Sequence, residues 1–153
     1  MPASLHARRV VVTGHTGFKG AWLTLHLREL GADVRGIALP ARSPSLFEQA
    51  GVAALIPGQL VDVRERRALD RALDDAAPEV VFHLAAQALV PQSYVEPHET
   101  FEVNLLGTLN VLEWARTNSN LRALVLVTSD KCYENAGDGR PFREGDPLGK
   151  RDP

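Results

Sequence analysis

Residues 10–20 read VVVTGHTGFKG, and this stretch decides the fold class. Three β-branched residues run directly into a Gly-x-x-Gly-x-x-Gly pattern. Gly14 permits a tight turn out of a buried strand, and Gly20 lets the following helix pack close to the sheet. Gly17 removes a Cβ at the point where the backbone would approach a pyrophosphate. The stretch therefore predicts a strand–loop–helix unit whose loop binds a dinucleotide, rather than a structural turn without a ligand.

The helix after this loop would present unpaired N–H groups and a partial positive charge to the phosphates. Lys19 would add positive charge at the same place. The order Gly-Lys-[Ser/Thr] is absent, so the loop is not a Walker-type mononucleotide loop. The cofactor-binding residues predicted here are Gly14, His15, Thr16, Gly17, Phe18, Lys19 and Gly20.

Composition and charge are those of one globular domain. The chain has 153 residues, of which 44% are hydrophobic, and its net charge of −2 excludes a strongly basic surface for nucleic acid or anionic lipid. Cys132 is the only cysteine, which excludes an internal disulfide and a cysteine-based zinc site. The histidines form no His-x-x-x-His pair, so we expect no metal site. Without an apolar leader or spanning run, we expect a soluble, cytoplasmic protein.

Strands and helices alternate along the chain. Short apolar runs without strict polar alternation are typical of strands buried on both faces of a parallel sheet. We expect strands at residues 8–13, 33–39, 57–61, 79–84 and 122–128, and helices from about 22 to 30, 64 to 76 and 97 to 117. Residues 40–57 leave room for a short helix only. The predicted fold class is α/β, a Rossmann-like doubly wound parallel sheet with helices on both faces, truncated after about five strands.

The longest predicted helix carries Phe101, Leu105, Leu109 and Leu112 on one face. We interpret Leu105, Leu109 and Trp114 as core residues. Asn104 interrupts the apolar stripe, so it either satisfies a buried backbone group or faces solvent.

Further binding residues are expected at the carboxyl ends of the strands, where ligands of doubly wound sheets lie. Asp62 and Val63 follow the third strand. The Asp62 carboxylate is placed to accept a hydrogen bond from an adenine amino group, or to cap a helix that begins at Arg64. After the fourth strand come Leu84, Ala85, Ala86 and Gln87, where the small residues leave room for a cofactor. The second strand ends without an acidic residue, which leaves NAD and NADP both open.

Several motifs in register resemble the extended short-chain dehydrogenase/reductase superfamily, and more narrowly its NAD-dependent nucleotide-sugar epimerases and dehydratases. They are the glycine loop, residues 62–64, residues 83–87, residues 104–108 and residues 128–133. The similarity covers nearly the whole chain and is greatest to the 4,6-dehydratases that act on CDP-glucose. It implies NAD as cofactor, a nucleotide sugar (CDP-glucose) as substrate, and a homo-oligomer in full-length members.

The resemblance also implies roles for the segment after the fifth strand. Ser129 would hydrogen-bond the sugar 4-OH, Asp130 would act as the acid at the C6 oxygen, and Lys131 would act as the base at C5. Related dehydratases carry Glu at the position of Lys131. Thr128 and Asn104 are assigned to the cofactor side of the same site. From the residues alone, a polar strand-to-loop turn with exposed charges is the favoured explanation of Ser129 and Asp130, because both residue types are common in turns.

The Tyr-x-x-x-Lys pair on which this family relies is not found at either tyrosine. His98 stands four residues after Tyr94, and Gly137 four residues after Tyr133. We therefore expect residues 1–133 to be an NAD(P)-binding domain and residues 134–153 a loop that leads to this pair and to a substrate domain. On this interpretation the chain alone binds a dinucleotide but is inactive. The alternatives are a nucleotide-sugar 4-epimerase of the same superfamily and a non-catalytic dinucleotide-binding module.

Overall fold

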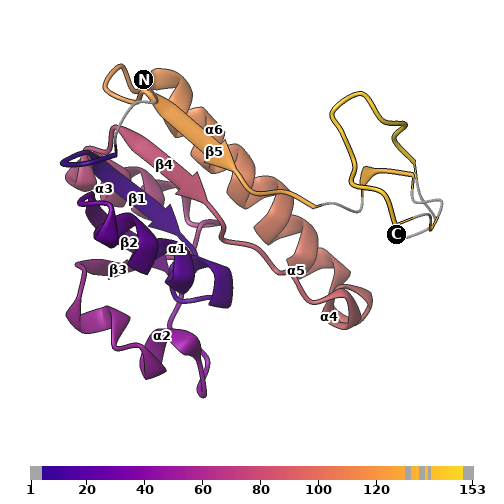
Figure 1. Cartoon of the computed structure of the whole chain (residues 1–153), viewed down its shortest axis with the longest axis horizontal. Coiled ribbons are helices and arrows are strands. Elements are labelled where there is room, and N and C mark those ends of the chain that lie inside the picture. The colour runs from indigo at the N-terminus through magenta and orange to yellow at the C-terminus, as the bar shows by residue number, and fades with distance from the viewer. Residues whose placement is uncertain (1–4, 130–131, 135–136, 138, 150–153) are drawn as a thin grey trace.

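A parallel five-stranded sheet forms the centre of the protein (Figure 1). The computed structural model describes residues 5–129, 132–134, 137 and 139–149. The strands are β1 (Arg9–Thr13), β2 (Asp33–Ala38), β3 (Gly58–Leu60), β4 (Val80–His83) and β5 (Ala123–Leu126). Their order is β3-β2-β1-β4-β5, and every adjacent pair is parallel. The predicted fold class is confirmed, and the direction of winding reverses between β1 and β4.

Helices join these strands. They are α1 (Phe18–Glu29), α2 (Leu46–Gln49), η1 (Val52–Ala54), α3 (Arg66–Ala76), α4 (Val90–Val95), α5 (Pro97–Phe101), the π-helical turn η2 (Glu102–Gly107) and α6 (Thr108–Thr117). The stretch between β2 and β3 holds only the short helices α2 and η1, as expected. From α5 to α6 the helix is continuous in sequence but contains the π-helical turn, a local widening that often occurs at functional sites.

Two apolar cores lie on opposite faces of the sheet, because successive residues of a strand point to opposite sides. Val10 and Val12 of β1 belong to the core beneath α1, together with the buried Leu27. Val11 points the other way, into a second core beneath α3 and α6. The main residues of this second core are Ile37, Leu69, Leu73, Val81, Val111 and Trp114.

The core prediction for the long helix was right for Trp114 and wrong for Leu105 and Leu109. Trp114 is 4% exposed, whereas Leu105 and Leu109 are 60% and 47% exposed. The rotation of the helix explains the difference. Gly107 lies so close to Val63 that a Cβ on it would come within 2.6 Å of the valine Cγ2. Since Gly107, Val111 and Trp114 lie on the face that contacts the domain, the leucine stripe points outward.

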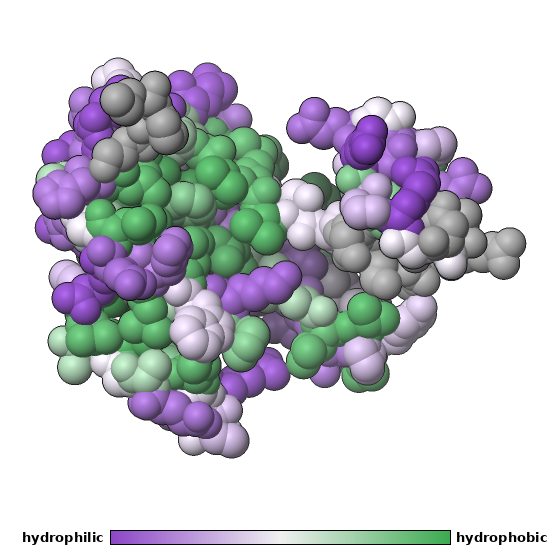
Figure 2. All heavy atoms as spheres, in the orientation of Figure 1, coloured by the Kyte–Doolittle hydropathy of each residue, from purple (hydrophilic) through white to green (hydrophobic). Residues whose placement is uncertain are grey.

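The face of β5 on the α1 side is left open, whereas Val80 of β4 on the same side is buried. Val125 and Val127 are 41% and 44% exposed. Leu124, which points to the opposite face, packs against the core beneath α3 and α6. Figure 2 shows hydrophobic side chains gathered over the part of the sheet where β4 and β5 lie in Figure 1. This face is therefore an apolar surface in the chain as described.

The described part of the C-terminal segment is a closed loop that stands apart from the sheet (Figure 1). An isolated antiparallel bridge joins Tyr133 to Leu148, and the ring of Tyr133 stacks on Phe142 with centroids 4.9 Å apart. Among the described residues, no helix is long and apolar enough to cross a membrane. The same residues include no group of three or more side chains arranged to hold a metal ion.

Candidate dinucleotide-binding site

The candidate site lies at the carboxyl edge of the sheet. Because all strands are parallel, the loops that follow β1, β3, β4 and β5 leave the sheet at this one edge. The glycine loop follows β1, residues 84–87 follow β4, and Thr128 and Ser129 follow β5. Loops predicted from distant parts of the sequence are thus brought to one end of the domain.

Two of the three loop glycines are required by the fold itself. Gly14 has a φ of +73°, and a Cβ on it would lie 2.7 Å from the backbone nitrogen of Ala85. A Cβ on Gly20 would overlap the carbonyl oxygen of Gly14. These glycines allow β1, α1 and the loop after β4 to meet closely, so their presence does not by itself indicate a ligand.

Gly17 differs, because neither its conformation nor its packing demands a glycine. Its φ of −77° and ψ of 167° suit any residue, and a Cβ there would meet only the carbonyl oxygen of Gly14, at 3.3 Å. Gly17 is exposed and forms the N-cap of α1 without a side-chain hydrogen bond. A bare backbone at the start of a twelve-residue helix fits the diphosphate of a dinucleotide, which needs close approach and free N–H donors.

The other loop side chains point in different directions. The Thr16 hydroxyl donates to the carbonyl oxygen of Leu39 at 3.0 Å, which ties the loop to the end of β2. Phe18 is 70% exposed, and Lys19 is also exposed. His15 is buried, and its ring lies against Gly36 in β2. Burial lowers the pKa of His15. A contact between His15 and a cofactor would therefore be made by its backbone.

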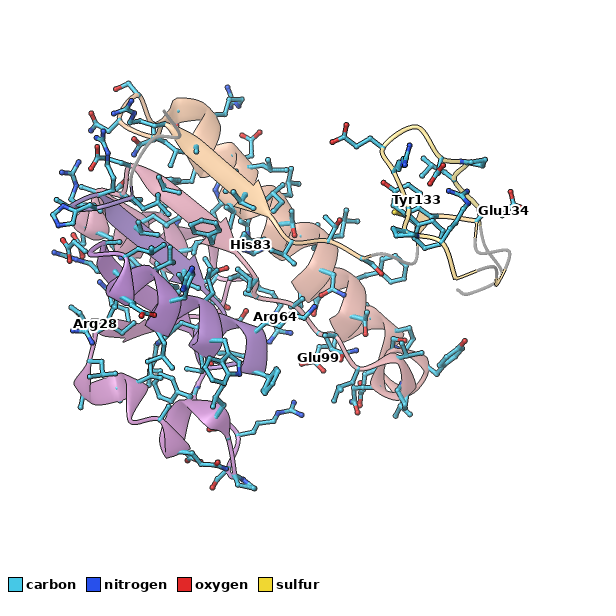
Figure 3. The ribbon with its side chains drawn as sticks, viewed as in Figure 1. Arg28, Arg64, His83, Glu99, Tyr133 and Glu134 are labelled. Carbon is cyan, nitrogen blue, oxygen red and sulfur yellow. The ribbon has the colours of Figure 1, made fainter. Side chains whose placement is uncertain are left out.

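Thr13 and His83 form a buried polar pair at the ends of β1 and β4. They are paired in register, and the Thr13 Oγ1 lies 2.7 Å from the His83 Nδ1. On the other side of the ring, the His83 Nε2 lies 3.2 Å from the Thr108 Oγ1. Burial lowers the pKa of His83 to about 4, so the ring is neutral at neutral pH. Figure 3 shows His83 near the end of the sheet, where the strands give way to loops.

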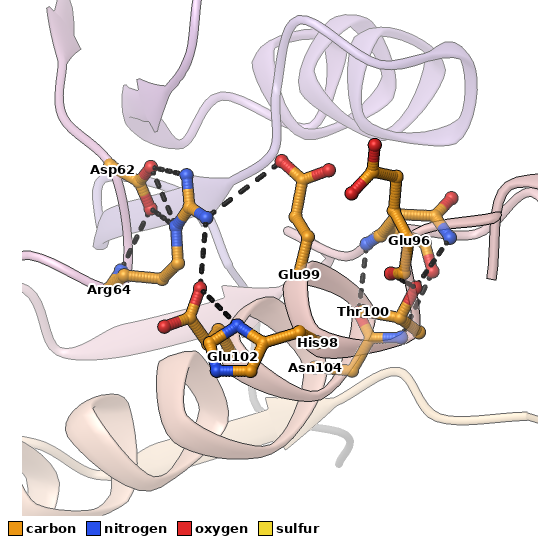
Figure 4. A network of polar contacts seen from close by, with 9 residues as sticks. Asp62, Arg64, Glu96, His98, Glu99, Thr100, Glu102 and Asn104 are labelled. Atoms are coloured by element: carbon orange, nitrogen blue, oxygen red, sulfur yellow. Dashed lines mark hydrogen bonds and ion pairs between the residues drawn. The ribbon is translucent and has the colours of Figure 1, made fainter.

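Asn104 combines its two predicted alternatives, because it is exposed and also hydrogen-bonds a backbone group, although that group belongs to the half-buried Gln87. Its Oδ1 accepts a hydrogen bond from the Gln87 N–H at 2.8 Å, and its Nδ2 donates to the Gln87 carbonyl oxygen at 3.0 Å. The Gln87 side chain in turn donates to the Thr100 Oγ1 at 3.0 Å (Figure 4). The π-helical turn thus presents an amide that holds the loop after β4 in place.

Asp62 is engaged by Arg64 and is not a helix cap. Its carboxylate accepts the Arg64 backbone N–H at 2.9 Å and the guanidinium Nη2 at 2.6 Å (Figure 4). These hydrogen bonds hold the pKa of the Asp62 carboxyl below its usual range. Helix α3 begins at Arg66 with Glu65 as its N-cap, so the capping interpretation of Asp62 is wrong. Its role toward adenine stays a prediction.

Arg64 also connects this loop to the helix that carries Asn104. Its Nη1 lies 3.8 Å from a Glu99 carboxylate oxygen and 3.5 Å from one of Glu102 (Figure 4). Val63, between Asp62 and Arg64, is buried, and its carbonyl oxygen accepts a hydrogen bond from Asn110 at 2.9 Å. Residues 62–64 are therefore fixed against the long helix by both charge and hydrogen bonding.

The predicted catalytic residues are only partly described. Thr128 and Ser129 are exposed and follow the end of β5. Asp130 and Lys131 lie outside the described residues. The structure thus brings together the glycine loop, residues 84–87 and Asn104. Sequence reasoning assigned no role to Thr13 or His83, although a polar residue ending each of two adjacent apolar strands was a usable signal.

A doubly wound parallel sheet with a glycine-rich loop at its switch point defines the Rossmann class of dinucleotide-binding proteins. The sequence pattern of the NAD dependent epimerase/dehydratase family matches residues 10–153, and the chain belongs to this family. Its cofactor is NAD, and the bare backbone at Gly17 suits that assignment.

Similar proteins include both dehydratases and epimerases. The chain is 46% identical over 147 residues to the CDP-glucose 4,6-dehydratase of Salmonella typhimurium, covering 95% of this chain and 41% of that protein. It is 33% identical over 147 residues to a probable UDP-glucuronate 4-epimerase of Rhizobium meliloti, covering 90% of this chain and 42% of that protein.

A solved structure of an epimerase is also similar to this chain in fold and sequence. The UDP-glucose 4-epimerase of Thermus thermophilus, determined as a complex with NAD, superposes with a TM-score of 0.79 at 31% identity. That match covers 94% of this chain and 45% of the epimerase. The chain therefore spans less than half the length of the relatives it matches.

Proposed function

We propose that this chain is the cofactor-binding part of an NAD-dependent nucleotide-sugar 4,6-dehydratase that acts on CDP-glucose. The observation that carries the proposal is the 46% identity to a CDP-glucose 4,6-dehydratase, against 33% to a 4-epimerase over the same length. The Ser-Asp-Lys triplet at residues 129–131, after the fifth strand, supplies the side chains that an elimination needs.

The proposed reaction converts the substrate to CDP-4-keto-6-deoxyglucose. NAD held at the glycine loop would supply the acceptor for the C4 hydride in its oxidised form and the donor of that hydride to C6 in its reduced form. The Ser129 hydroxyl hydrogen-bonds the sugar 4-OH. Once C4 is a ketone, the C5 proton is acidic. A desolvated, neutral Lys131 takes it, and Asp130 donates a proton to the C6 oxygen, which leaves as water. Lys131 gives its proton back to C5 when the hydride is delivered to C6.

The acceptor of the 4-OH proton is not assigned to a residue of this chain. The resemblance gives that role to a Tyr-x-x-x-Lys pair, and neither Tyr94 nor Tyr133 has a lysine four residues later. We therefore expect the purified 153-residue chain to bind NAD⁺ but not to convert CDP-glucose. The product would be analysed by chromatography and mass spectrometry. Detection of a 4-keto-6-deoxy sugar would refute this part of the proposal.

A chimera tests the elimination itself. Residues 1–153 would replace the matching N-terminal part of the Salmonella enzyme, and the product formed from CDP-glucose would be measured. We expect CDP-4-keto-6-deoxyglucose, and a loss of about 10²–10⁴-fold in its rate of formation with Asp130→Asn, because the acid for the leaving oxygen is gone. An unchanged rate with Asp130→Asn would contradict the dehydratase assignment.

The second candidate function is a nucleotide-sugar 4-epimerase, which the Rhizobium relative and the Thermus structure favour. An epimerase removes and returns hydride at C4 without expelling water, so it does not need the acid and base at residues 130 and 131. A chimera that epimerises its sugar, eliminates nothing and is insensitive to Asp130→Asn would favour this alternative.

We further propose that the whole protein forms a homo-oligomer through the outward stripe of its long helix. This stripe consists of Phe101, Leu105, Leu109 and Leu112, and all four side chains are more than 40% exposed. An apolar stripe with helical spacing on a surface helix is suited to packing against the same stripe of a second copy.

A further inference from the structure

The buried pair Thr13 and His83 has a single consistent arrangement of hydrogens. The Thr13 Oγ1 accepts hydrogen bonds from the backbone N–H groups of Leu84 and Ala85, both at 3.2 Å, and the Leu84 N–H is shared with the Thr13 carbonyl oxygen, also at 3.2 Å. A hydroxyl oxygen has two acceptor positions and one hydrogen to donate. With both acceptor positions filled, Thr13 has only its hydrogen left for the His83 Nδ1, 2.7 Å away.

The tautomer of His83 follows from this count. Because the Nδ1 accepts from Thr13, the proton of the neutral ring is on the Nε2. The Nε2–H then donates to the Thr108 Oγ1 at 3.2 Å. The Thr108 hydroxyl donates its own hydrogen bond to the backbone carbonyl oxygen of Asn104 at 2.7 Å. All hydrogens in this chain of contacts are thereby used, with no acceptor left over for a second proton on the ring.

The hydrogen-bonded series Thr13–His83–Thr108–Asn104, called the relay below, connects two loops of the cofactor site. At one end, Thr13 directly precedes Gly14, the first residue of the glycine loop. At the other end, the Asn104 amide forms two hydrogen bonds to the Gln87 backbone. Thr13 itself also holds the backbone of Ala85, so both ends of residues 85–87 are fixed by the relay.

We propose that His83 is a positioning residue for NAD⁺: as the Nε2–H tautomer it joins Thr13 to Thr108 and so sets the spacing between the glycine loop and residues 85–87. The inference rests on NAD binding by the family and not on the sugar reaction proposed above. The relay would act on the NAD-binding loops before any substrate is present.

Close packing makes this spacing sensitive. A Cβ on Gly14 would lie only 2.7 Å from the Ala85 backbone nitrogen, so the two loops meet too closely for any side chain between them. The low pKa of His83, caused by burial, keeps the ring neutral across the physiological range. A neutral ring is what the hydrogen count requires.

The first test is nitrogen NMR of the ¹⁵N-histidine-labelled protein without cofactor at neutral pH. We expect the His83 Nδ1 to resonate as an unprotonated nitrogen and the Nε2 as a protonated one, assigned by comparison with His83→Gln. A protonated Nδ1, alone or together with a protonated Nε2, would overturn the relay. This result does not depend on the dehydratase proposal.

The second test measures NAD⁺ affinity by calorimetry. Thr108→Val removes the hydroxyl at nearly constant shape, and we expect it to weaken NAD⁺ binding about tenfold by leaving the His83 Nε2–H unpaired. Thr108→Ser keeps the hydroxyl and should restore most of the affinity. If Thr108→Val does not fold, Thr108→Ala replaces it in the comparison with serine.

Thr117 provides the matched control. Its hydroxyl donates to a carbonyl three residues earlier in α6, at 3.0 Å, but it lies at the far end of the helix from Asn104. Thr117→Val should leave NAD⁺ affinity unchanged. Equal affinities for the serine variant and the variant without the hydroxyl at position 108 would overturn the positioning role.

Discussion

The three glycines of the loop show how one residue type serves two purposes. Gly14 and Gly20 make the turn and the close packing possible, whereas the fold gives no reason for Gly17 to lack a side chain. The sequence pattern already predicts a separate role for each of the three. The geometry around each position agrees with that division, because Gly17 is the one of the three whose missing side chain the fold does not require.

At the same scale, His83 predicts a pH dependence of stability. Its pKa is about 4 in the folded protein, below the ordinary 6.5, so the unfolded chain binds the proton more readily. This contribution is fully present above about pH 6.5 and is lost as the pH falls toward 4. The loss amounts to about 3 kcal/mol, by 1.36 kcal/mol for each pKa unit.

Denaturant unfolding between pH 7 and pH 4 measures this effect. We expect His83→Gln, which cannot be protonated, to flatten the fall in unfolding free energy across this range. His26→Gln, which removes an imidazole on the exposed side of α1, serves as the control. Equal slopes for the unmodified protein and His83→Gln would contradict the prediction.

At the scale of elements, the long helix shows what periodicity predicts and what it leaves open. The spacing of Phe101, Leu105 and Leu109 correctly indicates one apolar face. Yet the helix has a second apolar face, and the domain packs on that one, where Gly107 lies too close to Val63 for a side chain to fit between them. A sequence read alone does not say which of two apolar faces meets the core.

The arrangement of the strands and helices also explains which site residues could be predicted from the sequence. Binding residues at strand ends follow from parallel topology, since all carboxyl ends share one edge. The relay through His83 depends on the side chains of β1, β4 and α6 meeting in space. The contact of Asp62 with Arg64 and the start of α3 at Arg66 depend on local hydrogen bonding, which helix periodicity does not report.

Packing between the sheet and α3 gives a direct stability prediction. Leu69 is fully buried in the core beneath α3 and α6. We expect Leu69→Ala to lower the unfolding free energy by about 2–5 kcal/mol, because it removes apolar contacts and leaves a cavity. Leu30→Ala, at the 45% exposed C-cap of α1, should cost less than about 1 kcal/mol. Similar losses for the two variants in denaturant unfolding would be inconsistent with this core.

At the scale of the whole molecule, the outward stripe predicts self-association. We expect Leu105→Lys to shift the protein toward the monomer in analytical ultracentrifugation, because burying an unpaired ammonium in an apolar interface is unfavourable. Leu60→Lys alters an even more exposed leucine on β3, at the opposite edge of the sheet, and should leave the mass unchanged. If both variants keep the mass of the unmodified protein, the stripe is not the interface.

The account depends on the claim that the diphosphate of NAD binds at the glycine loop. Calorimetric titration of the unmodified protein and of Gly17→Ala with NAD⁺ tests this claim. We predict saturable binding to the unmodified protein and binding weaker by roughly tenfold or more for Gly17→Ala, with an unchanged melting temperature. The added methyl group needs only a few tenths of an ångström from the Gly14 carbonyl but would occupy the approach of the diphosphate. Absence of saturable binding, or equal affinity in a folded Gly17→Ala, would contradict the account.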